Sequence, residues 1–389
     1  MNDYICISAL FRKIKSFKHI FIGTFFFSFL FAGAQKNGLL SNKKWYLKAA
    51  VNYGFIMQHR ATIGHLITSY VPMAEIDLVK PSDGSKMWHL ENNKPDIGLT
   101  FTFLDFGNPK VLGHGYAIAP FIEIPLNKKE KASRLIFRTA WGLAYMTKRF
   151  DIRENHKNIA IGSNWDAFVQ FRFQWTINLT QKFRIEPGFG ISHVSNGRMQ
   201  VPNLGLNLIT LHMGLTYKLS DPKTEITKID SSTKVPSRNE LLVWGAAGVN
   251  EKDPPGGNKL PAYTLSFNYF YNVRNTHKVG AGLDLYYEES HVKDLEVFDY
   301  PHSTFSEKMR AGIKFAYSYN VGRISFPIEI GYYFYSPYND DGPLFHRFGV
   351  RYTGSKGLFL QFGMKSHWIV AYHFDLGVGY RIPLKKKNT

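Results

Sequence analysis

Apolar and polar residues alternate along most of the chain with a period of two, which is the pattern of a β-strand that has one apolar and one polar face. The clearest run extends from Trp165 to Asn178, where apolar side chains hold nearly every odd position and Asp166, Gln170 and Arg172 hold even ones. Similar runs recur through the sequence, and no segment beyond the first 34 residues has the period of a long amphipathic helix. The pattern therefore predicts an all-β protein.

The alternating runs divide into two series of candidate strands, of which we expect 12–16 to form. The first series lies at residues 45–56, 67–79, 96–106, 114–124, 134–147, 164–179, 182–195 and 205–219. The second series lies at residues 239–250, 261–273, 277–289, 306–319, 322–335, 344–353, 356–366 and 368–384. The polar stretch 220–237 separates the two series, and it either divides two domains or forms one long turn.

The alternation alone fits both a soluble sandwich and a membrane barrel, because the two differ only in which face meets water. Charged residues in mid-strand, such as Arg138, Arg172 and Asp375, suit a wet lumen, and aromatic residues mark the ends of many apolar faces. The last run also ends close to the end of the sequence, as is common in outer-membrane barrels. These features favour an antiparallel transmembrane outer-membrane β-barrel. Short turns and long loops alternate as such a barrel requires, except for the long loop 80–95.

The first 34 residues have the layout of a secretory signal peptide, with basic residues at 12–18, an apolar core at 19–31 and the small residues Ala32-Gly33-Ala34. The alternative is a membrane anchor, but the apolar run is shorter than the roughly 20 residues of a comfortable span. The expected organisation is a signal peptide at 1–34, barrel strands at 35–219, the connection 220–237 and further barrel strands at 238–389.

Composition narrows the candidate chemistry and partners. The only cysteine, Cys6, lies in the expected signal peptide, so the mature chain has no thiol nucleophile, disulfide or cysteine metal site. The net charge of +18 is compatible with nucleic acid, but an exported membrane protein meets anionic lipid first. We therefore expect outer-membrane lipids, and no nucleic acid, as partners.

The segment 188–219 carries the candidate catalytic groups. His193 and Ser195 lie on the apolar, lipid-facing side of one run, where polar groups are costly unless they pair or meet a lipid head group. Residues two apart on a strand lie about 6–7 Å apart on one face, so the imidazole can accept the hydroxyl proton. A loop centred near Gln200 brings Asn207 opposite His193, where its amide oxygen can fix the ring tautomer.

The turn after Ser195 supplies the remaining candidates. Asn196 and the peptide N–H groups of the Asn196-Gly197 turn can stabilise an oxyanion, and Arg198 can contact a substrate phosphate. The scheme requires no metal and no cofactor. The alternative interpretation is that His193 and Ser195 are rim residues and that Asn196-Gly197 is an ordinary loop turn.

His-x-Ser-Asn-Gly followed by Pro-Asn-x-Gly-Leu-Asn resembles the active-site hairpin of the outer-membrane lipid A 3-O-deacylases, the PagL-type acyloxyacyl hydrolases. The resemblance implies that His193 is the base, Ser195 the nucleophile and Asn196 an oxyanion-hole residue. The third member in that family is usually a Glu fourteen positions after the His, and Asn207 stands there instead. An asparagine can orient the ring but cannot stabilise imidazolium with a charge. The resemblance covers about residues 96–219 and leaves the second half unexplained.

These observations predict a serine esterase of the bacterial outer membrane that removes an ester-linked acyl chain from lipid A, the lipid anchor of lipopolysaccharide. The rival hypothesis is a non-enzymatic channel or structural barrel, because sixteen strands in one barrel would enclose a pore. A third hypothesis combines the two, with a degenerate deacylase hairpin in a barrel that has another use.

Overall fold

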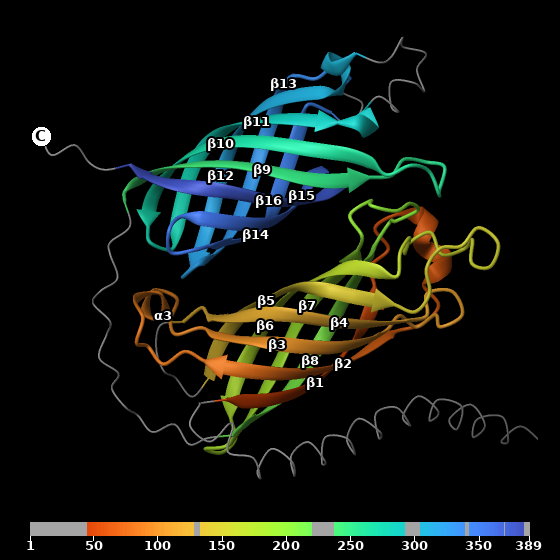
Figure 1. The fold of residues 1–389 in the computed structure, drawn as a ribbon. Coiled ribbons are helices and arrows are strands. Elements are labelled where there is room, and N and C mark those ends of the chain that lie inside the picture. The colour runs from red at the N-terminus through yellow and green to blue at the C-terminus, as the bar shows by residue number, and fades with distance from the viewer. Residues whose placement is uncertain are drawn as a thin grey trace, which may run out of the picture.

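The computed structural model describes residues 45–127, 133–219, 237–291, 304–338, 342–368 and 370–384. The expected signal peptide and nearly all of the connection 220–237 lie outside these ranges. Within them, sixteen antiparallel strands close as two separate barrels of eight strands each (Figure 1).

The first eight strands form the N-terminal barrel: β1 (Tyr46–Ile56), β2 (Val71–Pro81), β3 (Asp96–Asp105), β4 (His114–Pro125), β5 (Ser133–Met146), β6 (Trp165–Asn178), β7 (Phe183–Ser195) and β8 (Leu206–Lys218). The C-terminal barrel consists of β9 (Asn239–Asn250), β10 (Leu260–Arg274), β11 (His277–Glu288), β12 (Met309–Val321), β13 (Ile324–Tyr335), β14 (Leu344–Thr353), β15 (Leu358–His367) and β16 (Val370–Leu384). Three short helices lie in loops: η2 (Ala61–Leu66), α3 (Met87–Glu91) and η3 (Phe305–Lys308).

The number of strands agrees with the prediction, but a single wide barrel does not form. β8 pairs back to β1, with Lys218 opposite Tyr46, and β16 pairs back to β9, with Leu384 opposite Asn239. An eight-stranded barrel has an interior just wide enough for its own side chains. The single sixteen-stranded barrel on which the pore hypothesis depends is therefore absent.

The polar faces point into the barrels, as predicted, and their charges pair across the N-terminal lumen. Lys48 Nζ donates to carboxylate oxygens of Glu123 at 2.6 Å and of Glu186 at 2.5 Å. Arg138 Nη1 donates to Asp77 at 2.5 Å and to Glu123 at 3.0 Å. All five side chains are buried. A buried charge is stable only when it is paired in this way, so the network fills the lumen with satisfied ion pairs.

The C-terminal lumen is built on the same principle with a different set of residues. Lys314 Nζ forms an ion pair with Asp284 at 2.8 Å and donates to Glu329 at 2.7 Å. Arg347 Nη2 donates to Asp375 at 2.5 Å, so the predicted lumen position of Asp375 is confirmed. Lys314 pairs with residues of the two neighbouring strands, Arg347 pairs with β16 across one strand, and buried apolar residues such as Trp244 and Phe270 fill other parts of this lumen.

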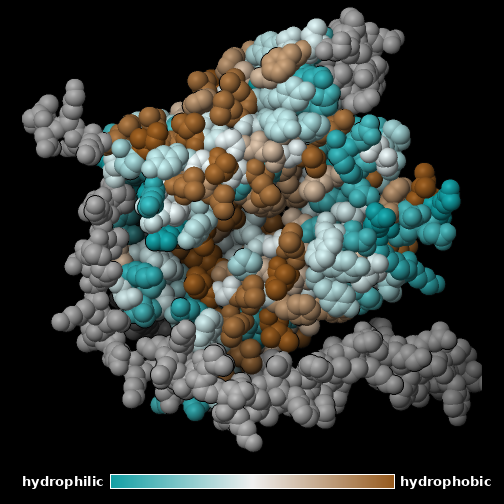
Figure 2. All heavy atoms as spheres, viewed as in Figure 1, coloured by the Kyte–Doolittle hydropathy of each residue, from teal (hydrophilic) through white to brown (hydrophobic). Residues whose placement is uncertain are grey.

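The outer faces of both barrels are apolar. Leu211 on β8 is 72% exposed and Leu376 on β16 is 70% exposed, which is far beyond what a water-soluble protein shows for a whole belt of large apolar residues. Figure 2 shows these apolar side chains over the middle of both barrels, with hydrophilic residues toward the ends. No helix in the described ranges is long and apolar enough to cross a membrane. The molecule is a transmembrane protein that crosses with its strands.

The two barrels also contact one another at the end where the chain enters β1 and β9, here called the entry end. The long β2–β3 loop, the exception to the predicted loop pattern, carries α3 and lies against turns of the C-terminal barrel. Tyr319 donates its hydroxyl to the side-chain oxygen of Asn92 at 2.6 Å. A side chain at Gly322 would meet the Trp88 ring at 3.1 Å, so the two surfaces are closely packed. Because this loop is long enough to reach the C-terminal barrel, it joins the two barrels at the entry end.

Candidate active site

The candidate catalytic groups lie on the hairpin of β7 and β8, at the end of the N-terminal barrel opposite the entry end. The ladder places His193 directly opposite Asn207, which is the register that the sequence predicted. Phe189 on β7 and Leu211 on β8 are exposed on the outer face, and His193 shares their phase along the strands. His193 and Asn207 therefore continue the outward-facing series of the hairpin as partly exposed residues.

Asn207 contacts two histidine rings. Its side-chain Oδ1 lies 2.7 Å from His193 Nδ1, and its Nδ2 lies 3.4 Å from His59 Nδ1. His59 Nε2 in turn lies 3.1 Å from the Leu204 carbonyl oxygen, which can only accept a hydrogen bond. When His59 carries its proton on Nε2, its Nδ1 accepts from the Asn207 amide; the same Nδ1 also lies 3.4 Å from the Met57 carbonyl oxygen. With Oδ1 of Asn207 as the acceptor, His193 donates from Nδ1, and Nε2 is then the ring nitrogen that can act as a base.

Ser195 is buried, and its hydroxyl oxygen lies at the convergence of two donors. Gly197 N donates to Ser195 Oγ at 3.1 Å, and Asn203 Nδ2 donates to it at 2.8 Å. Among the hydrogen bonds of the described residues, none joins Ser195 to His193. Both side chains approach Gly205, whose added Cβ would lie 3.0 Å from His193 Cε1 and 3.3 Å from Ser195 Cβ. A bond between nucleophile and base that tightens only with substrate is common in apo enzymes.

The side chain of Asn196 holds the loop after the nucleophile. Its Nδ2 donates to Ser163 Oγ at 2.8 Å and to the Gln200 carbonyl at 3.0 Å, which uses both amide hydrogens. Its backbone N–H donates to Asn203 Oδ1 at 3.3 Å. Gly197 N and Asn203 Nδ2 are thus the donors nearest the nucleophile in this arrangement, and the oxyanion role of Asn196 stays a prediction.

Gly197 is required by its conformation and by its surroundings. Its φ of +63° lies in the left-handed region, and a Cβ there would come within 2.2 Å of Phe374 Cδ2. Phe374 belongs to β16 of the C-terminal barrel. The second barrel therefore packs directly on the residue two places after the nucleophile.

Glu251 is the second contact from the C-terminal barrel to this loop, and it lies just after β9. Its Oε2 accepts from Val201 N at 2.9 Å and from Lys259 Nζ at 2.7 Å, and its backbone N–H donates to the Arg198 carbonyl at 3.0 Å. The Glu251 side chain is fully buried. A buried carboxylate with three donors, Gly256 N included at 2.8 Å, fixes the position of the loop strongly.

Sequence reasoning missed three of these residues. Asn203 stands within the Pro-Asn-x-Gly motif, so its position beside the turn was a usable signal. His59 and Glu251 reach the hairpin from 148 and 50 residues away in the chain, and no local pattern marks them. The side chain of Arg198 is half-exposed beside the site, where its predicted contact with a substrate phosphate stays a prediction.

The arrangement has the parts of a nucleophilic esterase: a hydroxyl, an imidazole with a free Nε2, an amide that orients it, and convergent N–H donors. No group of three His, Cys, Asp or Glu side chains in the described ranges is arranged to hold a metal ion. The fold and site together define a transmembrane β-barrel protein with a candidate Ser/His hydrolase site on its lipid-facing rim.

Comparison with protein families identifies both halves of the chain. Residues 74–216 match the model of the lipid A 3-O-deacylase (PagL) family, and residues 239–386 match the model of the acyloxyacyl hydrolase C-terminal domain. The chain belongs to the PagL-type acyloxyacyl hydrolase family and is a protein of the bacterial outer membrane. The sequence resemblance is thus confirmed, and it extends to the second half that it had left unexplained.

Solved structures give a weaker likeness, and no curated protein sequence matches the chain. Neisserial surface protein A is 9% identical over 45% of this chain and 97% of its own, with a TM-score of 0.31. The outer membrane enzyme PagL is 14% identical over 43% of this chain and 97% of its own, with a TM-score of 0.30. A mutant porin of Rh. blastica is 11% identical over 87% of this chain and 99% of its own, with a TM-score of 0.18. At these TM-scores the likenesses carry no argument about the site.

Proposed function

We propose that the protein is an outer-membrane serine esterase that removes an ester-linked acyl chain from lipid A. The observation that carries the proposal is the hydrogen bond between Asn207 and His193, which engages Nδ1 of the ring, while the His193 and Ser195 side chains both approach Gly205 at the rim. A base and a nucleophile on that surface meet an ester at the depth where lipid head groups join their acyl chains. The family match supports the substrate class.

In the proposed mechanism, Ser195 Oγ attacks the ester carbonyl carbon while His193 Nε2 takes the hydroxyl proton. The tetrahedral intermediate collapses, the sugar hydroxyl leaves with the proton from His193, and the acyl chain stays on Ser195 as an ester. Water then attacks this acyl-enzyme with His193 as the base, which releases the free fatty acid and restores the serine. Asn207 keeps the ring in the required tautomer throughout.

The developing oxyanion needs donors that are already in place. Gly197 N–H and the Asn203 amide converge on Ser195 Oγ and lie beside the carbon that it attacks. Asn196 contributes by holding the same loop, and the Asn196-Gly197 turn remains the expected oxyanion element. Arg198 extends from this turn and is suited to a phosphate of the glycolipid head group.

The test is mass spectrometry of lipid A from a host that expresses the full chain. Expression of the wild-type protein is expected to remove one ester-linked chain, and Ser195→Ala is expected to leave the acylation pattern as in a host without the gene. Thr210→Ala, a buried substitution on β8 that lies on the lumen side, serves as the control and should retain activity. If the Ser195→Ala protein removes the acyl chain as the wild type does, Ser195 is excluded as the nucleophile.

A further inference from the structure

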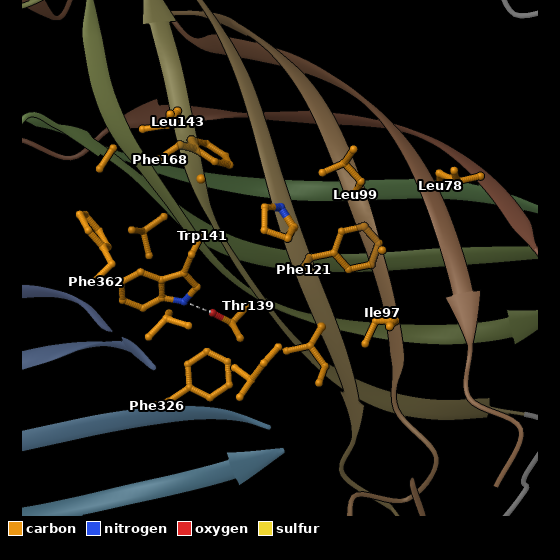
Figure 3. Close-up of a pocket in the computed structure, with 18 of the residues that line it drawn as sticks. Leu78, Ile97, Leu99, Phe121, Thr139, Trp141, Leu143, Phe168, Phe326 and Phe362 are labelled. Atoms are coloured by element: carbon orange, nitrogen blue, oxygen red, sulfur yellow. Dashed lines mark hydrogen bonds between the residues drawn. The ribbon is translucent and has the colours of Figure 1, made fainter. Parts of the chain in front are cut away.

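A cavity of about 660 Å³ lies between the two barrels (Figure 3). One wall consists of residues of β2 to β6, most of them with outward side chains, among them Leu99, Trp141 and Leu143. The other wall comes from the C-terminal barrel, through Phe326, Phe362 and other residues of β13 to β16. The volume is in the range of ligand pockets, and nearly all of the lining is apolar.

The cavity begins at the strand next to the candidate catalytic residues. Ala167 and Val169 on β6 line it, and they pair across the ladder with Ser195 and His193 respectively. Leu376 on β16 lines the opposite wall, two residues from Phe374, which packs on Gly197. The strands that lie against the catalytic rim, β6 of the N-terminal barrel and β16 of the C-terminal barrel, therefore also line the cavity.

The cavity continues from this rim toward the entry end. Trp45 lines it just before β1, and Ile324 lines it at the start of β13, so it follows the barrels through much of the membrane-spanning depth. Its few polar groups stand apart: Thr139 accepts a hydrogen bond from Trp141 Nε1 at 2.8 Å, and Lys80 lies near the Trp45 ring. An apolar space that runs from the rim toward the entry end matches one hydrocarbon chain that hangs from an ester held at the rim.

We propose that the cavity between the barrels is the binding site for the acyl chain of the ester substrate, and that the C-terminal barrel forms half of it. The inference rests on the proposed esterase function and adds a role for the second barrel. An acyl chain in the bilayer already lies in hydrocarbon, so the cavity is favoured over bulk lipid through close packing of its walls on the chain, and a long chain makes more of these contacts than a short one. Short esters gain nothing from it.

The first experiment maps the chain directly and does not depend on turnover. Full-length Ser195→Ala protein in detergent is mixed with a phosphorylated glucosamine ester whose dodecanoyl chain carries a diazirine, and crosslinked peptides are identified after irradiation. Crosslinks are expected on β5, β6 and β14 to β16, and they should be lost with Leu376→Trp. Crosslinks spread evenly over the apolar belts of both barrels, unaffected by Leu376→Trp, would overturn the proposal and leave the esterase function untouched.

The second experiment separates chain binding from catalysis. Leu376 is 70% exposed, so Leu376→Trp can narrow the cavity without disturbing a packed core. We expect hydrolysis of p-nitrophenyl dodecanoate to fall at least about tenfold and hydrolysis of p-nitrophenyl acetate to be unchanged. Leu283→Trp, on β11 and absent from the cavity lining, is the matched control and should alter neither rate.

Widening the cavity should have the opposite effect. Leu376→Ala is expected to shift the preference toward longer chains. Equal losses for both esters in Leu376→Trp would mean that the loop beside Ser195 is disturbed. Rates for both esters that are the same as in the wild type, in Leu376→Trp and in Leu376→Ala, would mean that the cavity holds only bystander lipid. Either result overturns the proposal. If the wild type hydrolyses no ester faster than Ser195→Ala does, the result counts against the esterase function. The crosslinking result does not depend on this outcome.

Discussion

The amide oxygen of Asn207 lies 2.7 Å from Nδ1 of His193, directly across the β7–β8 ladder. An asparagine at this place provides orientation without charge. The same position occupied by a carboxylate would add an electrostatic contribution when the ring becomes protonated.

Asn207→Glu is expected to raise kcat, because hydrogen bonds to a charged partner contribute about 1 kcal/mol more than neutral ones, which corresponds to about fivefold. Asn207→Leu removes the orienting acceptor and should lower kcat by about 10²-fold. Both are measured as initial rates of hydrolysis of a short p-nitrophenyl ester. Equal rates for the wild type and Asn207→Leu would show that Asn207 does not orient the base.

His59→Phe is expected to lower kcat about fivefold with little change in KM, because the Asn207 amide loses the acceptor that sets its orientation. His59→Gln retains an acceptor and should restore most of the rate. His65→Phe is the matched control, since His65 is also exposed and contacts only backbone carbonyls of Thr62 and Lys157. A loss of the same size in His65→Phe would assign the effect to the loop as a whole.

Asn203→Asp keeps the size of the side chain and replaces the donor to Ser195 Oγ with a carboxylate oxygen. We expect kcat to fall by about 10²-fold, which is the usual consequence of losing one oxyanion donor. Thermal stability, followed by the change in gel mobility of the barrel on heating, should change little. A fall in stability that parallels the fall in rate would argue that Asn203 acts only in the structure of the loop.

Glu251→Ala should release the loop after the nucleophile, because it removes the acceptor shared by Val201 N, Gly256 N and Lys259. We expect kcat to fall about tenfold or more and limited proteolysis to cut near the loop. Glu289→Ala removes the rim ion pair with Lys308, at 2.7 Å, and provides the control. If both variants behave alike, the C-terminal barrel does not position the catalytic loop.

Lys48→Met leaves the buried carboxylates of Glu123 and Glu186 without their shared cation. The expected loss of stability is about 3 kcal/mol, at the low end for buried pairs that lose one partner, because Glu123 keeps Arg138 and Glu186 keeps Arg184. Unfolding in urea, followed by tryptophan fluorescence, measures it. Lys182→Met, at an exposed position in the β6–β7 turn, should be neutral.

The alternation of residues was sufficient to predict the strands and their faces, because a side chain on a strand can point only in or out. It was insufficient for closure. Lys218 pairs with Tyr46 in the structure, but the same inward and outward pattern would hold if β8 paired with β9. The choice depends on which strand β8 meets, and periodicity carries no information about that.

The candidate site likewise has residues that could be predicted from the sequence and residues that could not. His193, Ser195 and Asn207 were predictable because one hairpin sets their register, and a hairpin is local in sequence. His59 and Glu251 approach from other loops, and their contacts exist only once both barrels are closed and packed together. Interactions of this kind follow from the tertiary structure and have no signature in the spacing of residues.

The ion pairs that fill both lumens also matter to the cell that carries the protein. Lys48 and Arg138 in one barrel, and Lys314 and Arg347 in the other, form buried ion pairs that occupy the interior where a porin would leave a water-filled path. We therefore expect neither barrel to conduct solutes across the membrane. The amount of protein produced can rise or fall with demand, and the permeability barrier to solutes stays intact.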